Sequence, residues 1–369
     1  MKRVRDDDNK IVEFLKQGVT EGVYPGSVLL VTKNSQIVFP HEVGCLSLSS
    51  RSLPMRKDTI FDLASLTKPL TTALCLMKLV DQNIIRLDQP LSEQITSSPL
   101  KNKGDMTPRQ LLNHSAGFED WRPFYHDLIH CRMEDRKRVL REWLVETPLI
   151  YQPGEGCIYS DLGFMFLEWL IEEASGNLMH HFVEDHFYRP LLLERTFLAQ
   201  RSSLKSFEKR MFAPTEDCPW RKRVIQGEVH DENAFALGGY SGHAGLFGVV
   251  DEVYGIVNLL KEHYQGVRDD YLKPETVREF FRRQNRVEGC TWALGWDTPS
   301  PQDSSSGNYF SPNSVGHLGF TGTSIWMDLD RDIIVVFLTN RVHPTRNNEK
   351  IREFRPKLHN IIMEQFSLI

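Results

Sequence analysis

Residues 61–70, Phe-Asp-Leu-Ala-Ser-Leu-Thr-Lys-Pro-Leu, constrain the fold more than any other stretch of the chain. Apolar residues follow at the spacing of one helix face, at Leu70, Ala73, Leu74, Met77 and Val80. Pro69 has no amide hydrogen to donate, which a helix tolerates only in its first turn, so the helix must begin close to Ser65. Residues three apart share a helix face, and the Lys68 amine can therefore reach the Ser65 hydroxyl.

The position of this serine–lysine pair indicates how a nucleophile could arise. The Ser65 hydroxyl would face the exposed amides and the positive end of the helix, beside a lysine that burial could render neutral and basic. A hydroxyl with a base at hydrogen-bond distance is the usual arrangement of a serine nucleophile. The same spacing also occurs where an ordinary helix cap precedes a solvated lysine, so further motifs are needed.

Composition narrows the classes of function. With 369 residues, the chain can form one large domain or two lobes around a shared core, which is ample for a buried active site. Hydrophobic residues make up 40% and charged residues 25%, as in soluble globular proteins. A net charge of −5 gives no reason to expect nucleic acid or an anionic membrane as a partner. We expect a small-molecule or peptide-like substrate instead, and the sequence indicates no oligomeric state.

The N-terminal residues and the cysteines bear on location. Residues 1–8 are charged and no apolar run follows them, so we expect neither a secretory signal nor a membrane span, and predict a cytoplasmic protein. The six cysteines have no close spacing, at positions 45, 75, 131, 157, 218 and 290. In a reducing compartment this pattern predicts unpaired thiols that serve as packing residues.

The order of predicted elements indicates an α+β fold. A short helix over residues 9–21 precedes a β-hairpin at 28–31 and 37–39, and a second antiparallel hairpin is predicted at 322–328 and 333–339. Residues 65–191 are mainly helical, and a last helix over 349–366 is expected to be interrupted near Pro356. We therefore predict a helical lobe at 63–191 and a sheet lobe made of 1–62 and 192–369, together one composite domain. The glycine-rich residues 236–246 predict a wall of tight turns rather than a phosphate cradle.

Three separated motifs resemble those of one family. Ser65-Leu66-Thr67-Lys68, Tyr159-Ser160-Asp161 and the stretch from His317 to Gly322 are similar, in order and spacing, to the Ser-x-x-Lys, Tyr-x-Asn and Lys/His-Thr-Gly motifs of serine β-lactamases and penicillin-binding proteins. Residues 111–117, 151–155 and 294–296 also resemble the recurrent phrases of the class C β-lactamase branch. The resemblance covers nearly the whole chain and implies the β-lactamase/transpeptidase-like fold, with an antiparallel sheet flanked by helices.

The resemblance implies roles for the motif residues. Ser65 would attack a carbonyl, and its proton could go to Lys68 or to the Tyr159 phenol, whose pKa should fall beside the Lys68 cation. We expect these two groups to share the roles of base and acid. The backbone amides of Ser65 and Phe320 would form the oxyanion hole. His317 is expected to give electrostatic support, as a donor toward the substrate or Tyr159.

Several positions depart from the pattern of the family. Asp161 stands where β-lactamases carry an amide; an ionised carboxylate cannot donate a hydrogen bond, and it could pair with Lys68. Leu318 replaces a small hydroxyl residue and His317 replaces a lysine, which reduces the positive charge where relatives hold a substrate carboxylate. These changes put β-lactamase activity in doubt. We expect Leu318 and Gly319 to contact the substrate.

Further histidines and Asn113 complete the candidate residues. Asn113 and His243 are expected to contact the substrate, although His243, like His230, is equally well interpreted as a polar loop residue. His126 and His130 have the spacing of zinc ligands on a helix but lack the intervening glutamate of a zinc protease. The histidines at 180, 181 and 186 lack it as well. We expect no metal and no cofactor.

The sequence thus predicts a serine hydrolase that acts through an acyl-enzyme on an ester or an amide, such as a cell-wall-derived peptide or muropeptide. Three alternatives stay open at this point. The first is a carboxylesterase, or a weak β-lactamase or DD-peptidase. The second is a member without catalytic activity that binds a peptide-like ligand in the same cleft. The third is a lipid or cell-wall enzyme of an oxidising compartment whose signal has been trimmed.

Overall fold

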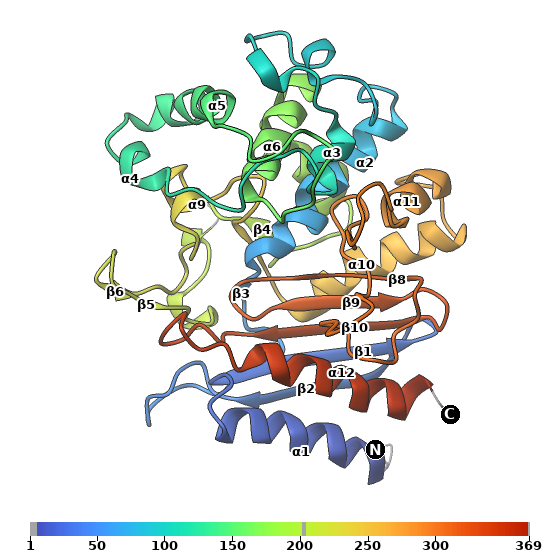
Figure 1. Ribbon diagram of the computed structural model, residues 1–369. Helices are drawn as coiled ribbons and strands as arrows, with labels where there is room; N and C mark the ends of the chain where they lie inside the picture. Colours follow the sequence, from blue (N-terminus) through green and yellow to red (C-terminus); the bar gives the residue numbers. More distant parts are fainter. Residues whose placement is uncertain (1–5, 201–203, 368–369) are drawn as a thin grey trace.

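Strands from both ends of the chain form one five-stranded antiparallel sheet, as Figure 1 shows. The computed structural model describes residues 6–200 and 204–367. The strand order is β2 (Gln36–Gly44), β1 (Gly26–Lys33), β10 (Ile333–Thr339), β9 (Ser324–Asp328) and β8 (Ser314–Leu318). Both predicted hairpins are confirmed. They meet at β1 and β10, where Leu30 is paired with Val336.

Helices cover both faces of this sheet (Figure 1). Successive side chains of a strand point to opposite faces, and in β1 and β10 both sets are apolar and buried. Leu29 and Val31 pack with residues of α1 (Asp6–Thr20) and α12 (Ile351–Ser367). Val28 and Leu30 belong instead to the core that includes α10 (Val250–Gln265). The predicted α+β class and the sheet flanked by helices are therefore confirmed.

Helix α12 does not break at Pro356, so the predicted interruption is wrong. A proline inside a helix removes one hydrogen bond and costs about 3 kcal/mol. Phe354, Leu358 and Ile362 of the same helix are buried in the core that α12 forms with the sheet. Each such side chain contributes roughly 1.5–3 kcal/mol when buried. Packing of the three together exceeds the cost of the proline, and the helix continues.

The middle of the chain is mainly helical and lies above one edge of the sheet in Figure 1. Its helices are α2 (Leu74–Asp81), α3 (Pro108–Leu112), α4 (Tyr125–Leu128), α5 (Arg136–Glu146), α6 (Asp161–Ser175) and α7 (Met179–Val183). Later in the chain come α9 (Glu232–Ala236) and α11 (Pro274–Phe281). A second, small sheet has the order β3 (Phe61–Asp62), β7 (Leu246–Gly248) and β4 (Phe197–Leu198), and β5 (Asp217–Cys218) pairs with β6 (Arg223–Val224).

Helix α6 begins where the second motif lies. The Ser160 hydroxyl accepts a hydrogen bond from the Gly163 amide and caps the helix, and Gly176 ends it with a positive φ of 68°. Tyr159 therefore precedes the cap, and Asp161 is the first residue of the helix. This placement brings both side chains to the N-terminal end of α6.

Two cysteines do not behave as the sequence predicts. Cys157 and Cys290 form a disulfide with their Cα atoms 5.8 Å apart, across 133 residues of sequence. The expectation that all six are unpaired is wrong because the fold, and not the spacing along the chain, brings these two together. Cys45, Cys75, Cys131 and Cys218 are free. Among the described helices, none combines the length and the apolar character that crossing a bilayer requires.

Candidate active site

Ser65 lies in a 3₁₀ turn, η1 (Ala64–Leu66), which leads through a π-helical turn, η2 (Lys68–Ala73), into α2. Ala64, just before it, has a φ of +48°, in the left-handed region that non-glycine residues rarely adopt. The Asp62 carboxylate accepts the Ala64 amide at 2.9 Å and the His230 amide at 2.6 Å, which holds this conformation. The chain reversal presents Ser65 to a pocket at the start of the helix.

The Lys68 ammonium is completely buried and uses all three of its hydrogens. Nζ donates to Asp161 Oδ1 at 2.6 Å, to Ser65 Oγ at 3.0 Å and to the His243 carbonyl at 3.3 Å. An ammonium has three donors and no acceptor, so the Ser65 oxygen receives a hydrogen bond from lysine rather than giving one. The Ser65 proton is thereby left for another acceptor.

The charge of Lys68 follows from its neighbours. Burial alone would lower its pKa, but the Asp161 carboxylate and the Tyr159 phenol outweigh burial and raise the pKa above its usual value. The expectation that burial makes Lys68 neutral is therefore wrong, because the interactions with Asp161 and Tyr159 outweigh the cost of burying the charge. The expected pairing of Asp161 with Lys68 is confirmed at 2.6 Å.

Tyr159 lies beside this lysine, with Lys68 Nζ 4.7 Å from the centroid of its ring. The phenol ring also packs at 4.7 Å from His114 and 5.4 Å from Trp292. Burial raises the pKa of Tyr159, and the Lys68 charge and hydrogen bonding to Lys68 and Ser65 oppose this rise without reversing it. The expected fall in its pKa is wrong, because desolvation outweighs the nearby cation. The phenol is neutral in the resting site.

His317 is neutral too. Burial and the Lys68 charge lower its pKa to about 3. Its Nδ1 donates to the Leu318 carbonyl at 2.9 Å, since a carbonyl can only accept, and Nε2 then carries a lone pair. His317 therefore cannot act as the expected donor toward Tyr159 or the substrate through Nε2. The ring centroid lies 6.0 Å from that of Tyr159.

The loop after β8 is hydrogen-bonded to the segment that precedes Ser65. Thr321 Oγ1 donates to the Asp62 carbonyl at 2.7 Å and Thr323 Oγ1 to the Leu63 carbonyl at 3.1 Å. A Cβ on Gly319 would lie 2.0 Å from Thr323 Oγ1, so only glycine allows this close approach. Phe320 is thereby fixed in the lining that also contains Ser65. These hydrogen bonds favour an arrangement in which the backbone amides of Ser65 and Phe320 together bind an oxyanion.

The glycine-rich stretch 236–246 forms a wall of close contacts, as predicted. A Cβ on Gly242 would lie 2.0 Å from the Phe164 carbonyl oxygen, and one on Gly239 would lie 1.7 Å from the Ala199 oxygen. The Gly242 carbonyl accepts from Thr72 of η2 at 2.6 Å. The wall thus supports the turn that carries Lys68.

The remaining candidates separate into two groups. His243 and Leu318 line the pocket, and His243 Nε2 is bonded to Asp231 at 2.9 Å. Burial would lower the pKa of His243, but Asp231 and Asp161 outweigh it and raise the pKa. Asn113 lies outside the lining: it is 1% exposed, and its side chain accepts from the backbone and hydroxyl of Ser115. Its position does not support contact with a substrate.

Among the residues that the structure describes, two groups of side chains have the composition of a metal site. They are Asp161, Asp231 and His243, and Glu216, Cys218 and Glu232. In the first group, Lys68 already binds Asp161 and His243 already binds Asp231. In the second group, the Arg346 guanidinium pairs with both glutamates. These cations occupy the carboxylates, so neither group favours a metal ion.

A pocket of about 660 Å³ joins these residues to others that sequence reasoning missed. The missed residues include Trp121, Asp231 and Trp292, and four arginines at 341, 346, 352 and 355. Trp292 packs between Tyr159 and His317, with ring centroids 5.4 and 5.5 Å away. No local pattern marks these side chains, because they reach the pocket from distant loops and from the start of α12.

Several known proteins are similar to this chain over most of its length. A family model described as Beta-lactamase matches residues 11–358. A putative D-alanyl-D-alanine carboxypeptidase of Escherichia coli (strain K12) is 32% identical, over 91% of this chain and 82% of that protein. An N-acetylmuramyl-L-alanine amidase of Bacillus subtilis (strain 168) is 29% identical, over 90% and 81%. The solved structure of EstCE1, a hydrolase with promiscuous acyltransferase activity, has a TM-score of 0.72 at 21% identity, covers 95% of this chain and 98% of its own, and supports the fold alone.

Proposed function

The chain belongs to the β-lactamase family, and from that premise we propose that it is a serine hydrolase that forms an acyl-enzyme on Ser65. The observation that carries the proposal is the contact of 3.0 Å between Lys68 Nζ and Ser65 Oγ, beside Tyr159 in the pocket. The proposed substrate is an ester or an amide of a cell-wall-derived peptide or muropeptide. No cofactor is needed for this chemistry.

The protonation states favour a relay through the phenol. Ser65 Oγ attacks the carbonyl carbon and gives its proton to the Tyr159 oxygen, while the phenol passes its own proton to the leaving group. The Lys68 ammonium stays protonated, and it stabilises the negative charge that develops on Ser65 Oγ and on the Tyr159 oxygen. The backbone amides of Ser65 and Phe320 would receive the oxyanion. Water then attacks the acyl-enzyme, and the relay runs in reverse: the Tyr159 oxygen takes a proton from the water and passes its own proton to Ser65 Oγ as the acyl bond to Ser65 breaks.

The class of substrate is supported by the names of the relatives. The E. coli and B. subtilis proteins are named for a peptidase and an amidase of wall peptides, and the chain covers more than four-fifths of each. Ordinary carboxylic esters are the alternative substrate, because esters react with the same acyl-enzyme chemistry.

A panel of substrates tests the proposal. We expect nitrocefin to be turned over with a kcat/KM roughly 10²-fold or more below that of at least one ester, amide or muramyl peptide. The reason is that Asp161 accepts but does not donate, and that His317 and Leu318 bring no charge to the subsite. Initial rates with nitrocefin, p-nitrophenyl esters and muramyl peptides provide the measurement. Fast turnover of the lactam, with fast deacylation, would contradict these interpretations of Asp161 and Leu318.

The cytoplasm is the proposed location. Cys45 and Cys131 are free and partly exposed, and such thiols persist best in a reducing compartment. The disulfide between Cys157 and Cys290 leaves four free thiols, and such bonds are rare in a reducing compartment. A thiol reagent, applied to protein from its own cells that is denatured without reductant, tests the location by counting the free thiols. A count of six would show that the bond is reduced in the cell and would support the cytoplasm, whereas a count of four would show that the protein works in an oxidising compartment.

A further inference from the structure

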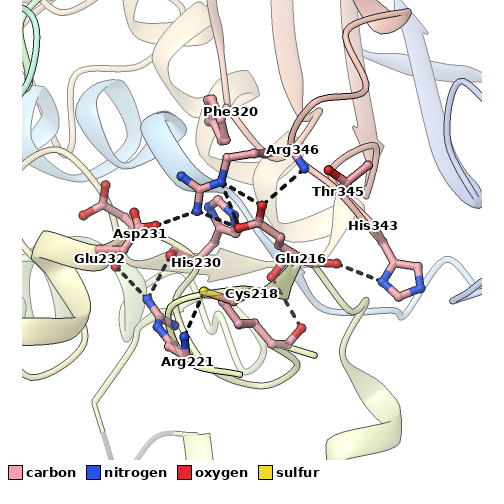
Figure 2. Close-up of polar contacts among 12 residues, drawn as sticks. Glu216, Cys218, Arg221, His230, Asp231, Glu232, Phe320, His343, Thr345 and Arg346 are labelled. Atoms are coloured by element: carbon pink, nitrogen blue, oxygen red, sulfur yellow. Dashed lines mark hydrogen bonds and ion pairs between the residues drawn. The ribbon is translucent and has the colours of Figure 1, made fainter. Parts of the chain in front are cut away.

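Arg346 shows how a guanidinium in the pocket lining is normally balanced. It donates to Glu216 from Nε at 2.8 Å and from Nη2 at 2.6 Å, and it also pairs with Glu232. Figure 2 shows it between Glu216 and Phe320, with His230 bonded to the same Glu216. Two carboxylates therefore neutralise this arginine, and it has little charge to offer a ligand.

Arg341 is different. It is 8% exposed, and its guanidinium lies 4.7 Å from the centroid of the Phe320 ring. Its hydrogen bonds go only to backbone carbonyls, those of residues 320, 346 and 348. Within the described ranges 6–200 and 204–367, no carboxylate lies within 4.0 Å to form an ion pair with it. These bonds hold the group in place beside the oxyanion residue. The Glu349 and Glu216 carboxylates act on its charge from beyond ion-pair distance, and burial outweighs them and lowers the pKa of Arg341.

Arg355 of α12 is still more isolated. It is 4% exposed and lines the same pocket, and its Nε has no hydrogen-bond partner in the described part of the chain. The nearby carboxylates are occupied elsewhere, since Glu349 pairs with Arg352 and Glu353 with Lys357. Burial and the Arg341 charge lower the pKa of Arg355 to about 9, which still leaves it charged at neutral pH. A buried charge without a partner is costly, and a strongly perturbed group that lines a cleft is a candidate for contact with a ligand.

We propose that Arg341 and Arg355 form an anion subsite of the pocket, and that the substrate carries a carboxylate or phosphate group that binds there. Guanidinium groups recognise both anions through paired hydrogen bonds. The subsite lies with Phe320 and the start of α12, apart from the uncharged His317 and Leu318, where the family resemblance implies carboxylate binding. The inference rests on the proposed function, and it adds the charge that the substrate must carry.

Binding of simple anions tests the subsite without catalysis. Titration calorimetry with the full chain, against sodium glutarate and inorganic phosphate at matched ionic strength, is expected to show saturable binding of at least one of them. Arg355→Gln and Arg341→Gln should each weaken that binding at least about tenfold. Preference for glutarate indicates a carboxylate on the substrate, and preference for phosphate indicates a phosphate. Arg352→Gln is the matched control, since Arg352 lines the same pocket but is exposed and paired with Glu349.

Two further measurements separate this subsite from a structural role and from the proposed function. The Tm of Arg355→Gln without anion should equal or exceed that of the wild type, because an uncompensated charge is removed, whereas loss of a structural arginine would lower it. Hydrolysis of neutral p-nitrophenyl acetate by the wild type measures the proposed function separately, because that substrate carries no anion for the subsite to bind. Should Arg355→Gln fail to fold, Arg355→Lys, which keeps the charge without the paired donors, should still bind both anions more weakly. The proposal is overturned if the wild type binds neither anion, or if Arg352→Gln weakens binding as much as Arg355→Gln.

Discussion

Replacement of Ser65 by alanine is expected to lower kcat at least about 10³-fold on whichever substrate of the panel is best. The change removes the attacking oxygen, and neither Lys68 nor Tyr159 can take its place, because one is protonated and the other is neutral. Binding of the substrate should persist. The measurement is initial rates together with intact-protein mass after treatment with a fluorophosphonate, which should add one adduct, located on Ser65 by peptide mapping.

The control for this variant is Ser97→Ala, which removes an exposed serine that bonds Glu173 on the surface. It should keep full activity and full labelling. If the wild type is not labelled and Ser65→Ala changes no rate, the enzyme assignment fails. In that case, a protein without catalysis that binds a peptide-like ligand in the same pocket becomes the better description.

Tyr159→Phe is expected to lower kcat by about 10²- to 10⁴-fold, the usual contribution of a positioned acid or base. The ring that packs against His114 and Trp292 is retained, so stability should change little. Single-turnover rates and thermal unfolding measure the two effects separately. Tyr309→Phe removes the hydroxyl of an exposed tyrosine outside the pocket lining and should leave both unchanged. A Tyr159→Phe protein within about threefold of the wild-type rate would exclude the phenol from the relay.

The pH profile tests the protonation state on which the relay depends. The pKa values of Tyr159 and Lys68 are both raised, so the phenol keeps its proton and lysine its charge beyond the usual tyrosine value of 10.0. We therefore expect kcat/KM, corrected for spontaneous hydrolysis, to show no rise between neutral pH and about pH 10. If a phenolate were the base instead, the rate would rise about tenfold per pH unit across that interval.

Local patterns predicted the elements of this fold well, and long-range pairings poorly. The hairpins and the start of α6 follow from alternation and capping, which operate over a few residues. The pairing of Ser27 with Thr339 joins positions more than 300 residues apart, and no local signal encodes it. The same is true of the Cys157–Cys290 bond. At Pro356, burial of the apolar side chains of α12 outweighs the tendency of a proline to interrupt a helix.

In the site, too, local motifs predicted which residues lie together but did not predict the interactions that set their charges. Motif spacing predicted that Ser65, Lys68, Tyr159 and Asp161 belong together. The structure brings Ser65, Tyr159 and Asp161 to one pocket, with the buried Lys68 bonded to Ser65 and Asp161. Their ionisation could not be predicted, because it depends on the depth of burial and on distances between groups from different elements. The burial of Asn113 outside the pocket lining could not be predicted, because the family phrase around it indicates a loop and not the direction of a side chain. The arginines at 341 and 355 lie in stretches without any motif.

The glycine wall restricts how this pocket could be redesigned. At Gly239 and Gly242 an added methyl group would meet backbone carbonyl oxygens at 1.7 and 2.0 Å, and backbone cannot move aside as a side chain can. Directed evolution toward new acyl groups should therefore accumulate changes at other positions of the lining, such as Trp121, Trp292 and Phe320. The scaffold thus combines an inflexible half, which preserves the chemistry, with an evolvable half, which can change what is bound.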